Sequence, residues 1–534
     1  MDRKKLQHIF YACIISLFFI LMAGILILLF GFQHRVDYLC KKEFILSNPI
    51  ILLLIIFVTI LCVFILKNKI QYDALFESKT RFSKRAVRWA SFFLFLIQLY
   101  ICYNIYFETM WDSGLIVENA RMISIGQRDN LANYYFSMYP NNVFLVWLYS
   151  LILKINSSIG VFAAADDLMA IVAVQCFLSS FTGYLLWLCA RNLFENERTA
   201  WLTWIIYVAL IGISPWMSIP YSDACGLIFP TAAFYLYLTI GEVEQGIKRY
   251  VRWGGIGLLA FWGYQLKPQL VIVFIAIIII ELLKCIPRKV SKEGLKRFIY
   301  TAAAIMAVFL VSTGISHSIK KATGIVIDKD GQFTLTHFAM MGLNYDTDGT
   351  FYDMDVYYSE SFPNVAERQA GNLKVIKERL AEYGFTKVMN HTARKLLVTY
   401  GDGTFAWGNE GNFYYKLHDD KNTIVSPFLK SIYYNNGKNF RLFSSILQII
   451  WIFILAGTTG IIFIIKKNIQ KKEKILVLAL SVIGLTIFEI LFEARARYLY
   501  TYIPFYIILA VFGWNNYLKY FLLKWRTKEN RMER

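Results

Sequence analysis

The chain has 534 residues, of which 57% are hydrophobic and 17% are charged, and its mean hydropathy is +0.46. A composition so apolar and so poor in charge excludes an ordinary soluble domain and predicts a polytopic membrane protein. The formal charge of +19 does not indicate a nucleic-acid partner, because the lysines and arginines gather in short loops between apolar runs, as the positive-inside rule describes.

Twelve apolar runs are candidates to cross a bilayer, since a span needs roughly 20 mostly apolar residues to cover ~30 Å of hydrocarbon. The first run follows the basic start MDRKKLQHIF, and it is long and lacks a small-residue cleavage site. We therefore expect a retained first span and not a signal peptide. The predicted spans are 10–31, 49–66, 88–106, 166–190, 199–214, 224–241, 252–266, 268–285, 297–315, 442–465, 474–494 and 498–518.

The basic loops orient these spans. Residues 3–5 place the N-terminus in the cytoplasm, and the basic segment 67–88 marks the loop after the second span as cytoplasmic, so the third span exits outward. The run Val143–Ile155 is short for a crossing, and counting it as a span would place the basic segment 284–297 outside. We therefore expect an amphipathic helix in the outer interface at this run, and both termini in the cytoplasm.

A polar, aromatic-rich segment, Phe107–Asn142, follows the third span and carries Asp112 near its start. Asp223 lies at the outer end of a later span. Ionisable groups near hydrocarbon are costly unless they are used, and Asp112 is placed to take a proton from an acceptor hydroxyl. Asp223 is a candidate to orient that acceptor or to bind a cation. The alternative is that both acids are ordinary residues of the membrane interface.

Three basic residues lie on the outer side, against the positive-inside bias. Lys267 stands between two closely spaced spans, and Arg495 and Arg497 lie in the segment FEARARYLY, together with Glu493 and Tyr498. Such cations would stabilise the charge on a departing lipid phosphate, and the guanidinium fork suits phosphate oxygens. The donor-binding candidates are therefore the three cations and Tyr498. The alternative is snorkelling, in which basic side chains at span ends reach the lipid headgroups.

The range 317–440 is predicted to be a soluble outer insert of α or α+β structure, with helix-forming composition at Val365–Tyr383. The stretches Thr336–Asp355 and Gly401–Lys416 combine aromatic rings, carboxylates and amides, as a sugar-binding surface requires, although a small domain core has a similar composition. His337 has no partner at metal-ligand spacing. The substrate-binding candidates of the outer segments are Glu118, Arg121, Tyr139, Asn141, Asn142, His337, Trp407, Glu410 and Glu493.

An ordered series of motifs resembles the C-type (GT-C) integral-membrane glycosyltransferases, and among them the bacterial relatives of protein O-mannosyltransferases and aminoarabinose transferases. The resemblance is best over spans three to eight. Two spans precede the usual first one, two asparagines follow Pro140 where relatives carry a double proline, and the insert matches no defined acceptor-binding domain. The motifs are Asp112, YPNN at Tyr139–Asn142, CARNLFENERTAW at Cys189–Trp201, Asp223, the pair Lys267 and Pro268, and ARARYLYTYIPF at Ala494–Phe505.

The resemblance implies an all-α GT-C fold and an enzyme that transfers a monosaccharide, with inversion at the anomeric carbon, from a polyprenyl phosphate to an extracytoplasmic glycan or glycopolymer. It gives Asp112 the role of catalytic base, Asp223 that of a second acid, and Lys267 a contact with the phosphate. Metal dependence varies among such enzymes, so a divalent cation stays open. Together with the basic loops, the resemblance predicts a bacterial plasma membrane protein whose active site faces outward.

The predicted organisation has two N-terminal helices in 1–87, a GT-C core in 88–316 with its catalytic outer loop at 107–165, the insert 317–440, and the last spans with a basic tail in 441–534. Two rival functions stay open. A transporter or flippase of lipid-linked saccharides would carry ionisable residues near the bilayer midplane, whereas the candidates here gather at one rim. The other rival is a non-catalytic membrane scaffold that displays the insert.

Overall fold

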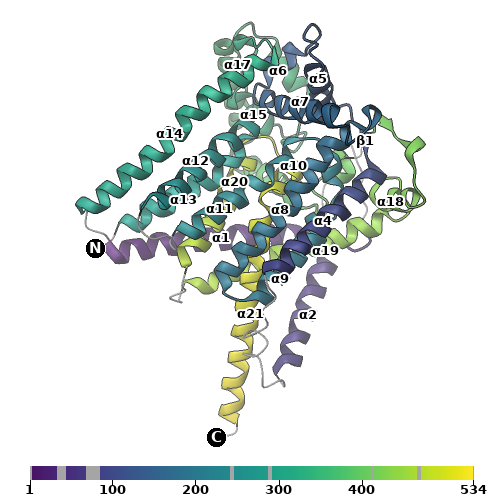
Figure 1. Ribbon diagram of the computed structural model, residues 1–534. Coiled ribbons are helices and arrows are strands. Elements are labelled where there is room, and N and C mark those ends of the chain that lie inside the picture. Colours follow the sequence, from purple (N-terminus) through teal and green to yellow (C-terminus); the bar gives the residue numbers. More distant parts are fainter. Residues whose placement is uncertain are drawn as a thin grey trace.

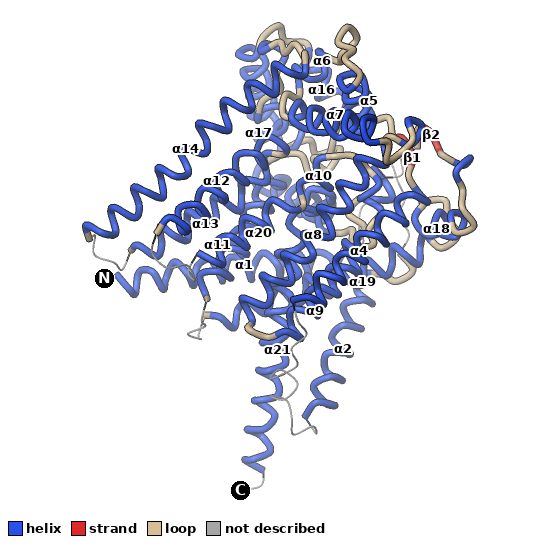
Figure 2. The backbone as a smooth tube through the Cα atoms, viewed as in Figure 1, coloured by secondary structure: helices blue, strands red, loops and turns tan. Residues whose placement is uncertain are grey.

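The computed structural model describes residues 3–32, 44–67, 84–240, 246–286, 291–411, 414–465 and 471–532. These residues are almost entirely helical (Figures 1 and 2), which confirms the predicted all-α membrane protein. The longer helices are α1 (Arg3–Gly31), α2 (Asn48–Lys67), α4 (Lys84–Ile105), α7 (Asn142–Ile159), α8 (Leu168–Phe194), α11 (Ile228–Ile240), α12 (Ile247–Leu266), α13 (Ile272–Cys285), α14 (Lys292–Thr323), α17 (Val365–Tyr400), α19 (Phe440–Thr458), α20 (Lys472–Leu491) and α21 (Ile503–Met532). The shorter elements are α5 (Asp112–Ser124), α6 (Asn133–Met138), α9 (Glu197–Tyr207), α10 (Ser222–Gly226), α15 (Leu335–Gly342), α16 (Asp353–Glu360), α18 (Ser426–Tyr433), β1 (Phe107–Glu108) and β2 (Lys416–Leu417).

Within the described residues, 11 helical stretches are long and apolar enough to cross a membrane. They include ten of the 12 predicted spans. The first exception is 199–214, where α9 ends at Tyr207 and a π-helical turn, Val208–Gly212, follows. The second is 252–266, whose helix α12 begins in the basic sequence IKRYVR and is less hydrophobic than a typical span.

The remaining candidate is α7, which includes the run Val143–Ile155 and extends beyond both of its ends. The helix has 18 residues, from Asn142 to Ile159, and it ends at Gly160, which adopts a φ of 73°. It packs along α5 and also contacts α8 and α14. By length and composition α7 is a candidate span. The helix is therefore longer than the apolar run indicated, and its place in the outer interface stays a prediction.

The orientation of the spans stays a prediction. The basic loops 68–83, 287–290 and 466–470, on which the orientation depends, lie outside the described residues. Figure 1 nevertheless shows two opposite ends of the molecule. Helices α5, α6, α15 and α17 lie at one end, and α21 leads to the C-terminus at the other.

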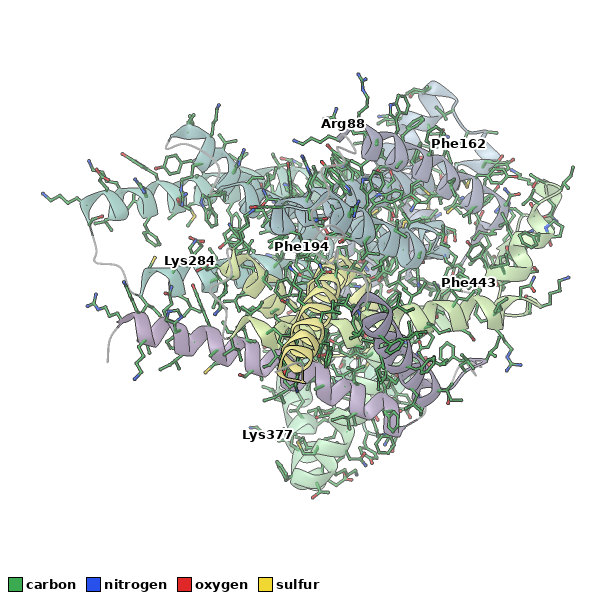
Figure 3. All side chains as sticks on the ribbon, turned by 90° about the horizontal axis from the view of Figure 1, so that it is seen from below. Arg88, Phe162, Phe194, Lys284, Lys377 and Phe443 are labelled. Carbon is green, nitrogen blue, oxygen red and sulfur yellow. The ribbon has the colours of Figure 1, made fainter. Side chains whose placement is uncertain are left out.

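The stretch Ala496–Leu522, which ends in α21, forms the centre of the bundle, with 94% of its most apolar window buried. Glycines allow the end of α19 to approach α21 closely, because a Cβ on Gly513 would lie 1.8 Å from the carbonyl oxygen of Gly457. Seen from below in Figure 3, side chains fill the space around α21, where Phe194 stacks on Phe512 with ring centroids 6.3 Å apart. In contrast, α14 stands at the edge of the molecule in Figure 1, and 6% of its apolar window is buried.

The insert is joined to the rest of the chain on several sides. Helix α14 continues to Thr323, past the predicted start of the insert at residue 317. The predicted helix Val365–Tyr383 is confirmed as the first part of α17, which extends to Tyr400 through a kink at Gly384, where φ is 57°. Strand β1 of the first outer loop pairs antiparallel with β2 of the insert (Figure 2). The insert and the first outer loop therefore form one structure at this end of the molecule.

Candidate functional site

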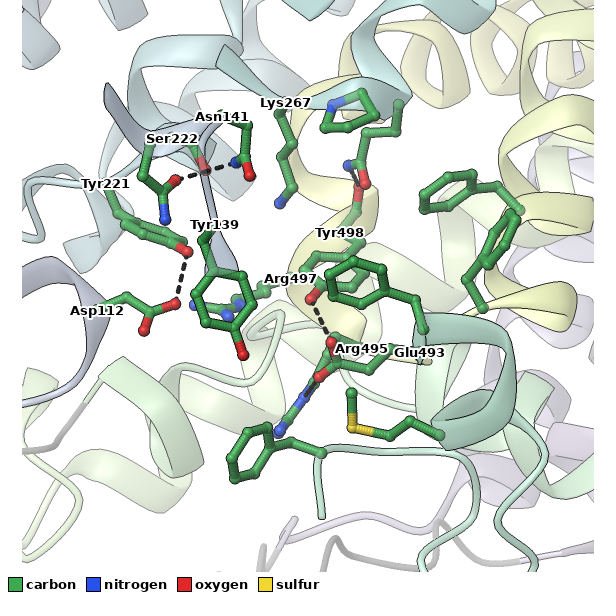
Figure 4. Close-up of a pocket in the computed structure, with 18 of the residues that line it drawn as sticks. Asp112, Tyr139, Asn141, Tyr221, Ser222, Lys267, Glu493, Arg495, Arg497 and Tyr498 are labelled. Carbon is green, nitrogen blue, oxygen red and sulfur yellow. Dashed lines mark hydrogen bonds and ion pairs between the residues drawn. The ribbon is translucent and has the colours of Figure 1, made fainter. Parts of the chain in front are cut away.

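A cavity of about 420 Å³ lies where the first outer loop and the insert meet the ends of several candidate spans. Figure 4 shows polar side chains approaching it from both sides, with Asp112 and Tyr221 opposite Glu493 and Tyr498. Nine residues predicted from the sequence line the cavity: Asp112, Tyr139, Asn141, Asn142, Lys267, Glu493, Arg495, Arg497 and Tyr498. Segments that are distant in the sequence are therefore brought together around one space.

Asp112 is the first residue of α5, where the positive end of the helix dipole favours a carboxylate. The Tyr221 hydroxyl donates a hydrogen bond to Asp112 Oδ2 at 3.0 Å. Burial raises the pKa of Asp112, whereas the charge of Arg497 and the hydrogen bonds from Tyr221 and Tyr135 lower it. The carboxyl group is therefore placed to exchange a proton closer to neutral pH than an ordinary aspartate does.

The turn that presents Asp112 depends on two small neighbours. A Cβ on Gly114 would lie 1.7 Å from the carbonyl oxygen of Thr109, so a glycine is needed where the chain folds back before α5. The Ser113 hydroxyl donates to the carbonyl oxygen of Pro220 at 3.0 Å, which ties the start of α5 to the segment that carries Tyr221. The motif WDSG thus fixes the carboxylate through backbone contacts.

Asp223 lies behind Lys267 and is 2% exposed. The two side chains form an ion pair, and Lys267 Nζ also lies 4.1 Å from the ring centroid of Tyr498. Burial lowers the pKa of Lys267, and the charge of Asp223 raises it. Lys267 lines the cavity but Asp223 does not, so the structure places Asp223 where it can act on a bound molecule only through Lys267.

The segment after α20 supplies an acid and two guanidinium groups to the cavity. Arg495 Nε donates to Glu493 Oε1 at 2.9 Å, and the Tyr498 hydroxyl donates to Glu493 Oε2 at 3.0 Å. Arg497 lies between Asp112 and Glu493 in Figure 4, and its guanidinium carbon is 4.8 Å from the ring centroid of Trp111 and 5.2 Å from that of Tyr221. These rings hold the guanidinium group beside the proposed base.

The remaining wall of the cavity is apolar. On α15, the spacing of three residues puts Leu335, Phe338 and Met341 on one face of the helix. Phe488 and Phe492 continue this wall from the end of α20, with ring centroids 4.9 Å apart. Leu335 is 60% exposed, so the apolar wall reaches the surface of the molecule. The cavity therefore combines charged groups with a surface that suits hydrocarbon.

Two predicted substrate-binding residues on α5 lie away from the cavity. Glu118 is exposed and does not line it. Arg121 forms ion pairs with Asp167, at 2.6 Å, and with Glu108, at 3.3 Å. These pairs connect α5 to the start of α8 and to β1. Arg121 thus holds the first outer loop together, because its charge is satisfied by protein carboxylates.

Two predicted residues of the insert, His337 and Trp407, are also not part of the cavity wall. His337 is buried, its Nδ1 lies 2.7 Å from the Ser359 hydroxyl, and burial lowers its pKa to about 4. Trp407 is buried in the core, and its Nε1 donates to the carbonyl oxygen of Tyr433 at 2.7 Å. Glu410 belongs to the π-helical turn Trp407–Gly411, and its side chain lies outside the described residues.

Several cavity residues were not predicted from the sequence. Tyr221 and Ser222 lie directly before Asp223, in an outer segment that the sequence had already indicated, but a tyrosine near a membrane interface is common. Gln269 follows Lys267 by two residues, and its Nε2 donates to the carbonyl oxygen of Tyr498 at 2.7 Å. Their role depends on tertiary contacts, which local motifs do not reveal.

Among the residues that the structure describes, no group of three or more His, Cys, Asp or Glu side chains is placed to hold a metal ion. The carboxylates that line the cavity are those of Asp112 and Glu493, and each accepts hydrogen bonds from neighbouring side chains. A divalent cation in the cavity would therefore take most of its ligands from a bound phosphate and water.

A comparison with curated proteins gives no match. A family model described as "Conserved hypothetical integral membrane protein" matches residues 3–518. This range includes ten of the 11 candidate spans, most of the last one, the insert and the described residues that line the cavity. This description agrees with the membrane nature inferred from the composition and from the helices. The chain therefore belongs to this family of conserved hypothetical integral membrane proteins.

Proposed function

We propose that the protein is an inverting GT-C glycosyltransferase, which transfers a monosaccharide from a polyprenyl phosphate to a cell-surface glycan or glycopolymer. The observation that carries the proposal is the cavity, in which the carboxylate of Asp112 shares one space with cationic side chains and an apolar wall. A lipid-linked sugar phosphate has the matching chemistry, because it joins a sugar, an anionic phosphate and a hydrocarbon chain.

The cations of the cavity would bind the phosphate of the donor. Lys267 forms an ion pair with Asp223, and Arg495 forms one with Glu493. Arg497 lies against the rings of Trp111 and Tyr221, and its charge acts on Asp112. The phosphate gains negative charge as its bond to the sugar breaks, and preorganised cations stabilise that charge in the transition state. The apolar wall takes the first isoprene units of the lipid.

In the proposed reaction, the acceptor hydroxyl attacks the anomeric carbon on the face opposite the phosphate. A bond from the acceptor oxygen to that carbon forms, the bond from the carbon to the phosphate oxygen breaks, and its electron pair leaves with the polyprenyl phosphate. Asp112 takes the proton of the hydroxyl, and its raised pKa makes it a stronger base than an ordinary aspartate. Displacement from the opposite face inverts the anomeric carbon.

The proposed setting is the bacterial plasma membrane, with both termini in the cytoplasm and the cavity on the outer side. The distribution of lysine and arginine in the sequence supports this orientation. A polyprenyl phosphate donor agrees with an outward-facing cavity, because lipid-linked sugars are available on that side, and the sequence contains no Walker loop for a nucleotide.

The test is a transfer assay with the purified protein in lipid nanodiscs, supplied with polyprenyl-phosphate sugars and with cell-surface glycan from a deletion strain. We expect Asp112→Asn to lower the rate about 100-fold or more, since it removes the general base but keeps the shape. The matched control is Asp129→Asn, which changes an exposed acid of the same outer segment outside the cavity.

Transfer at near wild-type rate by Asp112→Asn would overturn the assignment of the base. Movement of the lipid-linked sugar across the bilayer of proteoliposomes, without transfer to glycan, would favour a flippase. Equal glycan composition in the deletion strain and its parent would favour a scaffold.

A further inference from the structure

A buried lysine outside the cavity wall lies at the junction of three elements. Lys395 of α17 is 1% exposed, and its Nζ donates three hydrogen bonds to backbone carbonyl oxygens. The acceptors are Gly342, at 2.7 Å, Ile490, at 2.8 Å, and Phe492, at 2.6 Å. An ammonium group has three N–H donors, so these three bonds satisfy it fully.

Two of these acceptors explain why a cation is favourable here. Gly342 is the last residue of α15, and Ile490 lies in the last turn of α20. The carbonyl groups at the end of a helix lack partners within the helix and carry the negative end of its dipole. Lys395 therefore neutralises two helix ends at once. Burial lowers the pKa of Lys395 to about 7, and the nearby carboxylates of Glu489 and Glu493 raise it.

Glycines make room for this arrangement. A Cβ on Gly342 would lie 2.4 Å from the carbonyl oxygen of Phe492, and a Cβ on Gly349 would lie 2.9 Å from Lys395 Cε. Gly349 has a φ of 73°, and its carbonyl oxygen accepts a hydrogen bond from the backbone N–H of Ala494 at 2.9 Å. The stretch Thr336–Asp355 of the insert thus wraps around the chain that follows α20.

The chain held in this way carries cavity residues on both sides of Lys395. Phe492, Glu493 and Arg495 line the cavity directly after α20, and Met341 lines it just before Gly342. A buried lysine is costly unless all its donors are satisfied. Lys395 donates its hydrogen bonds to backbone carbonyl oxygens next to those cavity side chains. An ordinary stabilising lysine would have no such relation to the cavity.

We infer that Lys395 is a positioning residue, which fixes the chain from Ile490 to Arg495 and thereby the anionic-ligand side of the cavity. The placement of the chain follows from the contacts alone, whereas its effect on the donor phosphate rests on the proposed function.

The experiment compares Lys395→Met with Lys374→Met in the full-length protein in nanodiscs. Lys374 lies on the same helix, and its side chain is 74% exposed, so the control removes a lysine without these contacts. Amide hydrogen exchange reports the chain after α20. Binding of a polyprenyl monophosphate, and the KM and kcat for its sugar-loaded form, report the cavity.

For Lys395→Met we expect faster exchange in the segment 490–498 and about tenfold weaker binding of polyprenyl monophosphate. A tenfold loss is the effect of one charge-assisted hydrogen bond lost between the displaced cavity residues and the phosphate. The KM for the donor rises, and kcat at saturating donor changes less. A lysine that only stabilises the fold would lower the amount of folded protein without changing KM. Lys395→Arg, which keeps the charge but cannot present three donors from one nitrogen, gives an intermediate value and serves if Lys395→Met does not fold.

Unchanged exchange in 490–498, or faster exchange spread evenly over the chain, would overturn the positioning role. Unchanged binding with local loosening would overturn the link to the cavity. If the wild-type protein does not bind polyprenyl monophosphate, the proposed function fails, and the exchange result still decides the role of Lys395.

Discussion

The buried pair of Lys267 and Asp223 allows the structural role of a cavity cation to be separated from its role in binding. Their side chains are 11% and 3% exposed, so solvent screens the pair weakly. Replacing Lys267 by methionine keeps most of the volume but leaves the carboxylate of Asp223 buried without its partner. Removing one partner of a buried ion pair destabilises a protein by about 3–5 kcal/mol.

Removing both charges together avoids this penalty, because no unpaired charge then remains buried. The double variant Lys267→Met with Asp223→Asn removes both charges and should recover stability to within about 1 kcal/mol of the wild type.

The assay is a double-mutant cycle, in which unfolding by a denaturing detergent is followed by circular dichroism at neutral pH. Binding of polyprenyl monophosphate is measured for each folded variant. The double variant should be stable but should bind polyprenyl monophosphate more weakly than the wild type, since it lacks the charge of Lys267. A loss below about 1 kcal/mol for Lys267→Met, or a double variant no more stable than the single one, would refute the reasoning on burial. Full binding by the double variant would refute the phosphate contact.

Two further predictions concern the proposed base and the cation beside it. The transfer rate should fall as the pH is lowered, with a midpoint above the usual range of an aspartate, because burial raises the pKa of Asp112 and the base acts only when ionised. A pH–rate profile checks this prediction. The same fall in rate at acidic pH in the residual activity of Asp112→Asn would contradict it. Arg497→Lys keeps the charge but loses the planar group beside Trp111 and Tyr221, so the KM for the donor should rise about tenfold, whereas an unchanged KM would show that any cation suffices at this position.

The fold was predictable from the sequence where apolar composition alone decides the outcome. Ten predicted spans recur as long apolar helices, and the helical composition of Val365–Tyr383 correctly located the start of α17. The predictions were less accurate at the ends of elements. The run Val143–Ile155 gains its extra length from polar residues such as Asn156, which a hydropathy pattern leaves out although they continue the helix.

The candidate site, like the fold, was predictable from the sequence only in part. Charged residues near the ends of spans, such as Asp112 and Arg497, are conspicuous because they are costly there, and the structure brings them to one cavity. That they act on a lipid-linked sugar stays a prediction. Residue type alone could not show whether Arg121 and Trp407 bind a substrate, because arginines also form ion pairs within a protein and tryptophans also pack in its core. Lys395 could not be identified from the sequence, because its partners are backbone carbonyl groups, which have no signature in a sequence.

The contact between Gly114 and Thr109 bears on how tolerance to mutation should be interpreted in this protein. A side chain at position 114 would meet the backbone of Thr109, and relief would have to come from the turn that begins with Asp112. A mutational scan that scores only surface glycan would therefore rank Gly114 beside Asp112, although glycine offers no reacting group. Intolerance at a position can thus report the geometry of its neighbour, and chemical rescue or ligand binding is needed to tell the two apart.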